Sequence, residues 1–315
     1  MDFDDNFENY IADYVRTRNI DRVNRQSEDV HPIENFYVAY GKRILDLLIG
    51  IPAFIITIPI DIVVGLLVLI DMGWPVLFIQ ERPGKNGKYF KMYKFRSMRH
   101  EYDKDGNRIP AKERLTRLGL FIRKFSLDEL PNFWNIVKGD MSILGPRPLP
   151  ANFDGRYSDR HFMRHAVAPG LECPRMLSRE DYDTDYQHQL ESDIWYVENC
   201  TFLTDCKMVG RFFKMVLDMR QRKKNSELVA FFAGYDDDNC AINLAEALDR
   251  YPEIEESYKN KKKDYKAIEL KKNAIRFKAS PLRNNINRAT TSPSVVLSFQ
   301  GVHMSDERIA EGQRR

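Results

Sequence analysis

The longest apolar run of the chain lies between Ile44 and Ile70, where charged residues almost vanish. A helix of about 20 apolar residues can cross a bilayer, so this run is long enough to enter one. Pro52 and Pro59 lie inside the run, and Asp61 lies near its middle. Because each proline removes a helical hydrogen bond and favours a bend, the pattern predicts an interrupted membrane helix.

Two arrangements of this run remain open. A straight span is simpler, but it leaves Asp61 in hydrocarbon, where a carboxylate costs roughly 2.5–3.5 kcal/mol on insertion scales. A re-entrant helix-break-helix that enters and leaves on one face brings Asp61 towards the polar side. Basic residues mark the cytoplasmic side of a membrane, and they stand both before the run, at Lys42 and Arg43, and after it. We therefore favour the re-entrant form.

Residues 76–99 alternate apolar and basic side chains around a turn at Pro83 and Gly84. The apolar positions Phe90, Met92 and Phe95 predict a short strand or hairpin. The basic positions between and after them are suited to an anion. Equally, they suit a surface attracted to anionic headgroups, at about 1 kcal/mol per cation close to the membrane.

Residues 112–124 place Leu115, Leu118 and Ile122 on one helical face. Such a helix can lie in the membrane interface with its apolar side down, or it can pack on another helix. The later helix predicted from Asp205 to Arg222 leaves the same choice open.

The two ends of the chain differ from its middle. Residues 1–40 are polar, with a weak helical pattern that predicts a peripheral arm, and they contain no apolar leader. A helix is expected from Ala241 to Arg250, and the charge-dense stretch after Pro252 predicts a solvated or coiled-coil helix. The predicted divisions are an N-terminal arm (1–40), a membrane-anchored domain (41–225), a helical extension (226–279) and a disordered tail (280–315).

Composition narrows the classes of function. The chain has 315 residues, of which 30% are charged, and its net charge is only +3. This balance gives no reason to expect a nucleic-acid partner. The cysteines are scattered without the spacing of a metal site, which fits a reducing compartment: Cys173, Cys200, Cys206 and Cys240.

The stretch from Phe125 to Pro148 carries the candidate chemistry, because it sets the adjacent carboxylates Asp128 and Glu129 after the cation Arg123. Neighbouring carboxylates repel each other, so arginine or a divalent metal is expected to offset them. The alternative interpretation is a solvated pair at a helix start, with Ser126 as cap and Glu129 closing a capping box.

Three blocks, KRILDLLIG, QERPGKNGKYFKMYKFRSM and FSLDELPNFWNIVKGDMSILGPRPL, together resemble the bacterial sugar transferase family. These are monotopic polyprenyl-phosphate phosphoglycosyl transferases, and the similarity runs from about Tyr40 to Arg222. The resemblance implies an α/β, mostly α fold. It would combine a re-entrant membrane helix-break-helix, interfacial amphipathic helices and a small β-hairpin or sheet around the active site.

The resemblance also implies a mechanism. Asp128 would attack the sugar-bearing phosphorus of a UDP-sugar and expel UMP, and polyprenyl phosphate would then accept the sugar phosphate. Glu129 would complete the catalytic pair and hold Mg²⁺. The expected substrate-binding residues are Arg123, Arg147, Lys94, Arg96, Arg82 and Pro146. Asp140 has either a catalytic role or a turn-capping role.

The implied location is the bacterial inner membrane, with the site and both termini on the cytoplasmic face. The implied partners are a UDP-sugar, polyprenyl phosphate, the membrane, a second copy in a homodimer and downstream glycosyltransferases. ECPRMLSRE departs from the family pattern, so the sugar is not assigned. Two other functions stay open: an idle scaffold for glycan assembly, and an Asp-nucleophile lipid phosphatase. Truncation after Arg222 is predicted to leave the chemistry largely intact.

Overall fold

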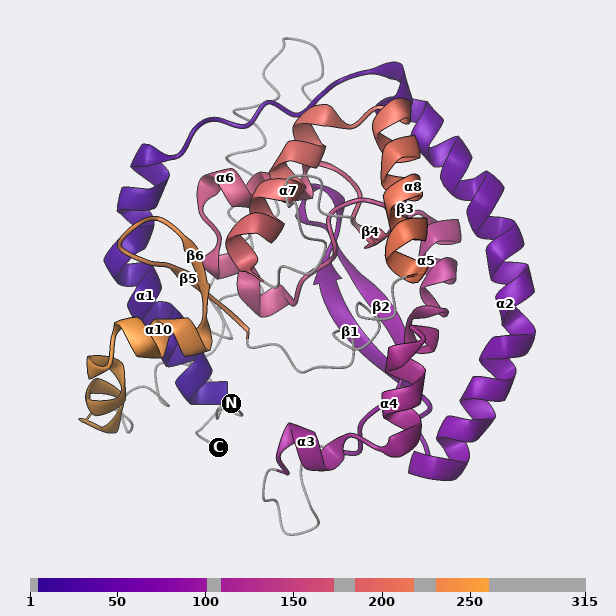
Figure 1. Cartoon of the computed structure of the whole chain (residues 1–315), viewed down its shortest axis with the longest axis horizontal. Coiled ribbons are helices and arrows are strands. Elements are labelled where there is room, and N and C mark those ends of the chain that lie inside the picture. Colours follow the sequence, from indigo (N-terminus) through magenta and orange to yellow (C-terminus); the bar gives the residue numbers. More distant parts are fainter. Residues whose placement is uncertain (1–4, 101–108, 173–184, 218–230, 261–315) are drawn as a thin grey trace, which may run out of the picture.

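The computed structural model describes residues 5–100, 109–172, 185–217 and 231–260. Two long helices, α1 (Asp5–Gln26) and α2 (Lys42–Met72), lie on opposite sides of the molecule with the smaller elements between them (Figure 1). Most described residues are helical, and the strands form two-stranded sheets. The prediction of an α/β, mostly α fold is confirmed at this level.

The middle of the chain forms these elements in order: β1 (Leu77–Pro83), β2 (Tyr89–Phe95), α3 (Ala111–Arg114), α4 (Arg117–Lys124), α5 (Asn132–Lys138), β3 (Ser142–Leu144), α6 (Asp159–Phe162), β4 (Gly170–Glu172), α7 (Tyr186–Asn199) and α8 (Phe202–Leu217). The last described part contains β5 (Phe232–Tyr235), β6 (Ala241–Asn243), α10 (Leu244–Arg250) and a helix at 253–260. β1 and β2 are antiparallel, β3 and β4 are parallel, and β5 and β6 are antiparallel.

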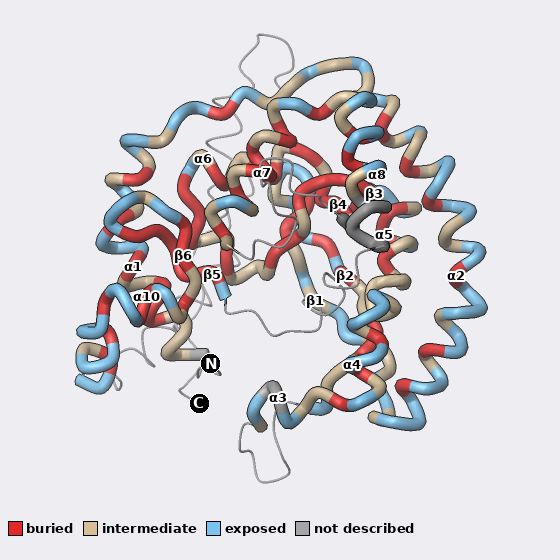
Figure 2. Tube along the Cα trace, viewed as in Figure 1, coloured by how far each residue is buried: buried red, intermediate tan, exposed pale blue. Residues whose placement is uncertain are grey.

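Helix α2 continues through Pro52 and Pro59, where the sequence predicts an interruption. It curves around the rest of the molecule instead of breaking (Figure 1), since the surrounding helical bonds survive the loss of one donor at each proline. Its outer face is exposed (Figure 2) and carries large apolar side chains, including Ile44, Leu48, Ile55, Ile62 and Leu66. Among the described residues this is the one segment long and apolar enough to span a membrane, and only 17% of its most apolar window is buried.

Both ends of α2 contact the rest of the protein. Near its start, the Lys42 ammonium lies 2.7 Å from an Asp205 carboxylate oxygen. Towards its end, Val64 and Val68 pack in a buried cluster with Ile122 of α4. A helix of this length is about 46 Å long at 1.5 Å per residue. The middle elements therefore meet α2 near both of its ends. Re-entry into a membrane stays a prediction.

The predicted hairpin at residues 76–99 is confirmed. β1 and β2 pair from Leu77 with Phe95 to Pro83 with Tyr89. Asn86 and Gly87 form the turn with φ of 55° and 68°, a left-handed conformation that glycine and asparagine tolerate best. Phe90, Met92 and Phe95 are buried, as their pattern predicts.

The single helix predicted at residues 112–124 is wrong, because the chain forms α3 and α4 with a break between them. Leu115 is extended and makes an isolated β-bridge with Met98. The Thr116 hydroxyl then caps α4 by accepting from the Gly119 amide. A side chain at Gly119 would lie 1.9 Å from the Ser97 carbonyl oxygen, so only glycine allows this close approach.

The first helix and the last described part of the chain fold together into what we call the terminal module: α1, β5, β6, α10 and the helix at 253–260. Ile11 and Val15 of α1 are fully buried in one cluster with Ile254 and with residues of β5, β6 and α10. The N-terminal segment is therefore not a peripheral arm, and the helix after Pro252 is not solvated along its whole length. The tyrosines Tyr10 and Tyr14 donate or share hydrogen bonds with this last helix.

The hairpin of β5 and β6 was not predicted from the sequence. The helix expected from Ala241 begins only at Leu244, because residues 241–243 pair with β5 and Asn243 forms a capping box with Glu246. The predicted domain boundaries stay predictions. Most of the ECPRMLSRE segment, the basic stretch after α8 and the predicted tail at 280–315 lie outside the described residues.

Candidate active site

The candidate carboxylates lie on a tight turn that follows α4. Ser126 has a φ of 54°, in the left-handed region, and residues 127–129 then form one turn of 3-10 helix. A non-glycine residue in this region is uncommon and often marks a functional site. Ser126 makes no side-chain cap, so the capping box proposed for Ser126 and Glu129 is wrong. The reversal of the backbone at Ser126 prevents it.

Glu129 is held by two cations. Its Oε1 atom lies 2.7 Å from the Lys94 ammonium, and the Arg147 guanidinium donates to the same oxygen. Burial by itself raises the pKa of Glu129, but Arg147 and Lys94 outweigh burial and hold that pKa at about 2. Glu129 is therefore ionised, and its position is fixed by strand β2 on one side and by the loop after β3 on the other.

Asp128 differs from its neighbour. Among the described residues it forms no ion pair, although the charges of Lys94 and Arg123 act on it. Burial is the largest influence on the Asp128 pKa and raises it, and the negative charge of Glu129 raises it further. The two cations oppose this rise without reversing it. The turn therefore presents one fixed carboxylate and one that is available to react.

The loop Pro146–Pro148 that carries Arg147 is fixed through its backbone. Each of its three successive carbonyl oxygens accepts a hydrogen bond: the first from the Gly170 amide at 3.0 Å, the second from Arg164 at 2.7 Å and the third from Arg82 at 3.1 Å. The two prolines have no amide hydrogen and a fixed φ. The backbone that carries the Arg147 side chain is therefore rigid.

Arg82 and Pro146, both predicted to bind substrate, have structural contacts in this loop. Arg82 donates to Gln80 as well as to the Pro148 carbonyl. Burial lowers the pKa of Arg82 to about 10, with a smaller contribution from the nearby charge of Arg147. Pro146 contributes its carbonyl oxygen to the bond with Gly170. Their contact with a substrate stays a prediction.

The structure does not bring all of the predicted residues to one point. Lys94 and Arg147 contact Glu129 directly, and Arg123 at the end of α4 influences Asp128 by its charge. Arg96 instead donates to the Met72 carbonyl at the end of α2. Arg96 follows Phe95, the last residue of β2, so the alternation of side chains along the strand does not determine where the Arg96 side chain points.

Two residues of α2 that the sequence analysis did not assign to the site form hydrogen bonds that hold the surrounding elements in place. Arg43 donates to the carbonyls of Ile136 and Val137 at the end of α5, at 2.6 and 2.7 Å. Asp46 accepts from the Ser142 hydroxyl at 2.9 Å and from the Ile143 amide at 3.0 Å, at the start of β3. A signal for both was present, because charged residues beside an apolar run require buried partners.

Arg164 and Asp193 were missed in the same way. Arg164 is 1% exposed and its guanidinium contacts Asp193 at 2.7 Å, besides donating to the Arg147 carbonyl. A buried charge needs a partner, and here each of the two residues is the partner of the other. His161 and His165 are buried, and His161 contacts Glu191 and Tyr235, which agrees with a packing role.

The matches to known proteins cover the part of the chain that carries this site. The model of the bacterial sugar transferase family matches residues 37–219. The chain belongs to the bacterial sugar transferase family. The match includes α2, both carboxylates and the loop of Arg147. It begins after α1 and ends before β5, so the whole terminal module lies outside it.

Several relatives extend this comparison. An uncharacterised sugar transferase of Bacillus subtilis is 39% identical over 56% of this chain and 87% of its own length. A UDP-N-acetylgalactosamine-undecaprenyl-phosphate N-acetylgalactosaminephosphotransferase of Aeromonas hydrophila is 33% identical over 57% of this chain and 44% of its own length. An undecaprenyl-phosphate galactose phosphotransferase of Salmonella typhimurium is 36% identical over 56% and 40%. The chain spans less than half the length of the last two, whose names specify different sugars.

Proposed function

We propose that this bacterial sugar transferase moves a sugar phosphate from a UDP-sugar to polyprenyl phosphate and releases UMP, as a first membrane step of polysaccharide assembly. The relatives named for undecaprenyl-phosphate transfer support the general reaction. The observation that carries the finer proposal is the difference between the two carboxylates. Glu129 is bound by two cations, whereas Asp128 has no ion pair among the described residues.

In the first half-reaction an Asp128 oxygen forms a bond to the sugar-bearing phosphorus. The bond from that phosphorus to the bridging oxygen breaks, and UMP leaves with the electron pair. In the second half-reaction an oxygen of the lipid phosphate forms a bond to the same phosphorus. The aspartyl–phosphorus bond breaks and regenerates the Asp128 carboxylate. A carboxylate is a competent nucleophile of this kind.

The cations around the turn explain how a carboxylate can meet a diphosphate. Arg147 and Lys94 already hold the Glu129 carboxylate, and Arg123 acts on Asp128. The planar guanidinium of arginine suits phosphate oxygens. We expect Arg123 and Arg147 to bind the donor phosphates and Lys94 to keep Glu129 oriented. Because the carbonyls of the Arg147 loop are fixed, little reorganisation is needed on binding.

The residues present fit a magnesium ion that arrives with the substrate. Within the described part of the chain, no cluster of three or more acidic, histidine or cysteine side chains could hold a metal alone. Magnesium commonly takes one or two protein carboxylates and completes its shell with substrate phosphates and water. Glu129 would hold it there, which leaves Asp128 to act as the nucleophile. When bound, it would neutralise charge on the leaving phosphate.

The surface of the protein suggests where the reaction takes place. Large apolar side chains are exposed on α2, on α4 at Phe121 and at the start of α8 at Phe202. Because α2 contacts the middle elements near both of its ends, we propose that it re-enters one leaflet and leaves on the same side. Basic flanks on both sides of the run favour the cytoplasmic face. The dyad would then lie where a soluble donor and a lipid phosphate can both reach it.

The test uses the purified full chain in lipid nanodiscs with Mg²⁺, polyprenyl phosphate and a panel of UDP-sugars. We expect UMP release with at least one donor. Without acceptor, we expect a burst of UMP close to one per active chain, together with a gain in protein mass of one sugar phosphate. Release of UDP would contradict the proposed chemistry. Release of inorganic phosphate without any UDP-sugar would instead support a lipid phosphatase.

A further inference from the structure

The hairpin of β5 and β6 packs against the region that carries the active site through two stacked ring pairs. Phe232 stacks on Tyr157, with ring centroids 5.6 Å apart and an angle of 20° between the planes. Tyr235 stacks on His161 at 5.6 Å and 19°. The hairpin lies beyond the segment matched by the family model, whereas Tyr157 and His161 lie within it. These stacks therefore join a feature of this chain to the shared fold.

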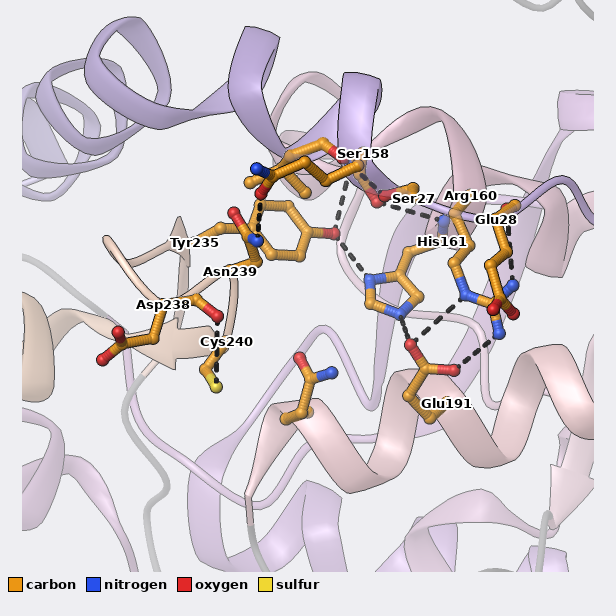
Figure 3. A pocket seen from close by; sticks show the side chains of 13 residues that line it. Ser27, Glu28, Ser158, Arg160, His161, Glu191, Tyr235, Asp238, Asn239 and Cys240 are labelled. Carbon is orange, nitrogen blue, oxygen red and sulfur yellow. Dashed lines mark hydrogen bonds and ion pairs between the residues drawn. The ribbon is translucent and has the colours of Figure 1, made fainter.

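Hydrogen bonds also join the β5–β6 hairpin to the region around α6. The Tyr235 hydroxyl accepts from the Ser158 amide at 3.0 Å and lies 2.8 Å from His161 Nδ1, while His161 Nε2 lies 2.9 Å from Glu191 (Figure 3). Arg156, which is 3% exposed, donates to the Phe232 carbonyl. Phe232 and Tyr235 are almost fully buried in this contact. The hairpin is thus a buried partner of the region around α6.

Tyr157 connects the hairpin to Arg164, which in turn contacts the active site. The Arg164 guanidinium lies 5.7 Å from the centre of the Tyr157 ring. The same guanidinium is paired with Asp193, and its Nη2 atom donates to the Arg147 carbonyl at 2.7 Å. The contacts therefore form a continuous column from Phe232 through Tyr157 and Arg164 to the backbone of Arg147.

The end of this column is a sensitive position. The Arg147 carbonyl lies between two prolines whose φ angles are restricted. A shift of the carbonyl therefore moves the base of the side chain that contacts Glu129. The Arg164 guanidinium is fully buried, so it cannot take another position without breaking its buried ion pair with Asp193, which is costly.

We propose that the β5–β6 hairpin is a positioning element of the transferase site, in which Phe232 acts through Tyr157 and Arg164 on Arg147. This proposal rests on the proposed transferase function. It makes turnover depend on a C-terminal segment that lies outside the family match, and it therefore opposes the prediction from the sequence that truncation after Arg222 leaves the chemistry largely intact. The role is one of positioning, because Phe232 itself has no contact with the dyad.

The decisive variant is Phe232→Leu, which keeps an apolar side chain and removes the flat ring. Its matched control is Ile254→Ala, a fully buried residue of the terminal module that belongs to a different cluster from Tyr157. We expect both variants to lower the melting temperature. Only Phe232→Leu should lower kcat for UMP release, by about tenfold, as for couplings carried through packed side chains.

Two further variants test the route of the effect. Tyr157→Phe keeps the ring and should retain most of the turnover, whereas Tyr157→Leu should match Phe232→Leu without adding to it. In an Arg147→Lys background, Phe232→Leu should cause almost no further loss. If Phe232→Leu and Ile254→Ala reduce turnover equally at matched stability, or if the Phe232 effect multiplies with that of Arg147→Lys, the proposal is wrong.

Hydrogen exchange separates this proposal from the proposed function. Amides of residues 142–149 should exchange faster in Phe232→Leu than in Ile254→Ala, measured on the full chain in nanodiscs. Unchanged exchange in that segment would overturn the coupling whatever the activity. Absence of UMP release by the wild-type chain, with the exchange difference still present, would refute the transferase assignment and leave the coupling supported.

Discussion

Helices α1 and α2 are the two longest helices among the described residues, and they bury opposite kinds of side chain. In α1 the apolar side chains Ile11 and Val15 are buried and most of the polar side chains are not. In α2 many of the largest apolar side chains are exposed, whereas the charged residues Lys42 and Asp46 are buried. Figure 2 shows exposed positions along much of α2. An ordinary soluble helix follows the first pattern. The inversion in α2 indicates that its surroundings are apolar.

The two sides also hold the active site by different means. On the α2 side, Arg43 donates to backbone carbonyls of α5, and Asp46 accepts from the Ser142 hydroxyl and the Ile143 amide of β3. On the side of the terminal module, Phe232 of the β5–β6 hairpin stacks on Tyr157. Direct polar contacts should transmit small displacements to the dyad. The apolar cluster around α1 should contribute mainly to stability.

The largest expected effect lies at the point where both sides converge. Asp128→Asn keeps the shape of the side chain and removes its nucleophilic charge. We expect UMP release to fall on the order of 10⁴-fold or more, as for the loss of a covalent nucleophile, with little change in melting temperature. A variant that retains a covalent sugar phosphate would show that the nucleophile lies elsewhere.

The α1 side is tested by Ile11→Ala. Loss of a fully buried isoleucine should destabilise the protein by about 2–5 kcal/mol. If α1 serves stability alone, kcat per folded molecule should stay near wild type at low temperature. The Ile11→Val variant provides the milder control, at about 0.5–1.5 kcal/mol. A fall in kcat that precedes any loss of folded protein would break the contrast with α2.

The outward face of α2 is tested by Ile56→Lys, at a position that is 66% exposed. A lysine in the membrane core costs roughly 2.5–3.5 kcal/mol on insertion scales, so we expect markedly weaker flotation with vesicles. Thr17→Lys on the exposed face of α1 is the matched control and should float like the wild type. Equal flotation of both variants would mean that this face of α2 does not lie in lipid.

The polar anchors of α2 are tested by Asp46→Ala, which leaves the Ser142 hydroxyl and the Ile143 amide without their acceptor. Loss of a buried acceptor costs about 1–3 kcal/mol. Turnover should fall together with stability, because β3 leads into the loop of Arg147. Asp46→Asn retains an acceptor oxygen and should recover most of the activity. Stability loss with unchanged kcat would remove the distinction between the two sides.

The sequence allowed much of the site to be predicted, because its parts are local. The adjacent carboxylates, the hairpin with buried Phe90 and Met92, and the apolar run each depend on short patterns. Arg43 and Asp46 were missed because their partners lie far along the chain and are mostly backbone atoms, so no spacing rule identifies them. The left-handed Ser126 was missed because a serine before two acidic residues resembles a helix cap.

The terminal module was missed for a different reason. Its core joins residues from the two ends of the chain, and neither end has enough apolar residues to predict a core by itself. The strand β5 is short and contains Gly234, which lowers its resemblance to a strand. The break before Thr116 likewise depends on a bridge between Leu115 and Met98, which local helical periodicity does not reveal.

The smallest expected effect concerns pH and distinguishes the two carboxylates. The raised Asp128 pKa means that the folded state favours its protonated form. Its contribution to stability is therefore complete below the ordinary pKa of about 3.9 and is lost as pH rises through the raised value. The lowered Glu129 pKa acts in the opposite sense: its contribution is present above about 4.3 and is lost as pH falls towards about 2.

The proposed reaction requires an ionised Asp128, so kcat/KM for UMP release should fall on the acid side at a pH above the usual aspartate range. The Arg123 charge lowers the Asp128 pKa, so Arg123→Ala should shift this fall in kcat/KM to higher pH. Arg96→Ala removes a cation that donates to the Met72 carbonyl instead, so it should leave the pH of this fall in kcat/KM unchanged while controlling for loss of positive charge. If kcat/KM falls at the same pH in the wild type and in Arg123→Ala, another group controls this fall. Asp128 would then lose its assignment as the ionising nucleophile.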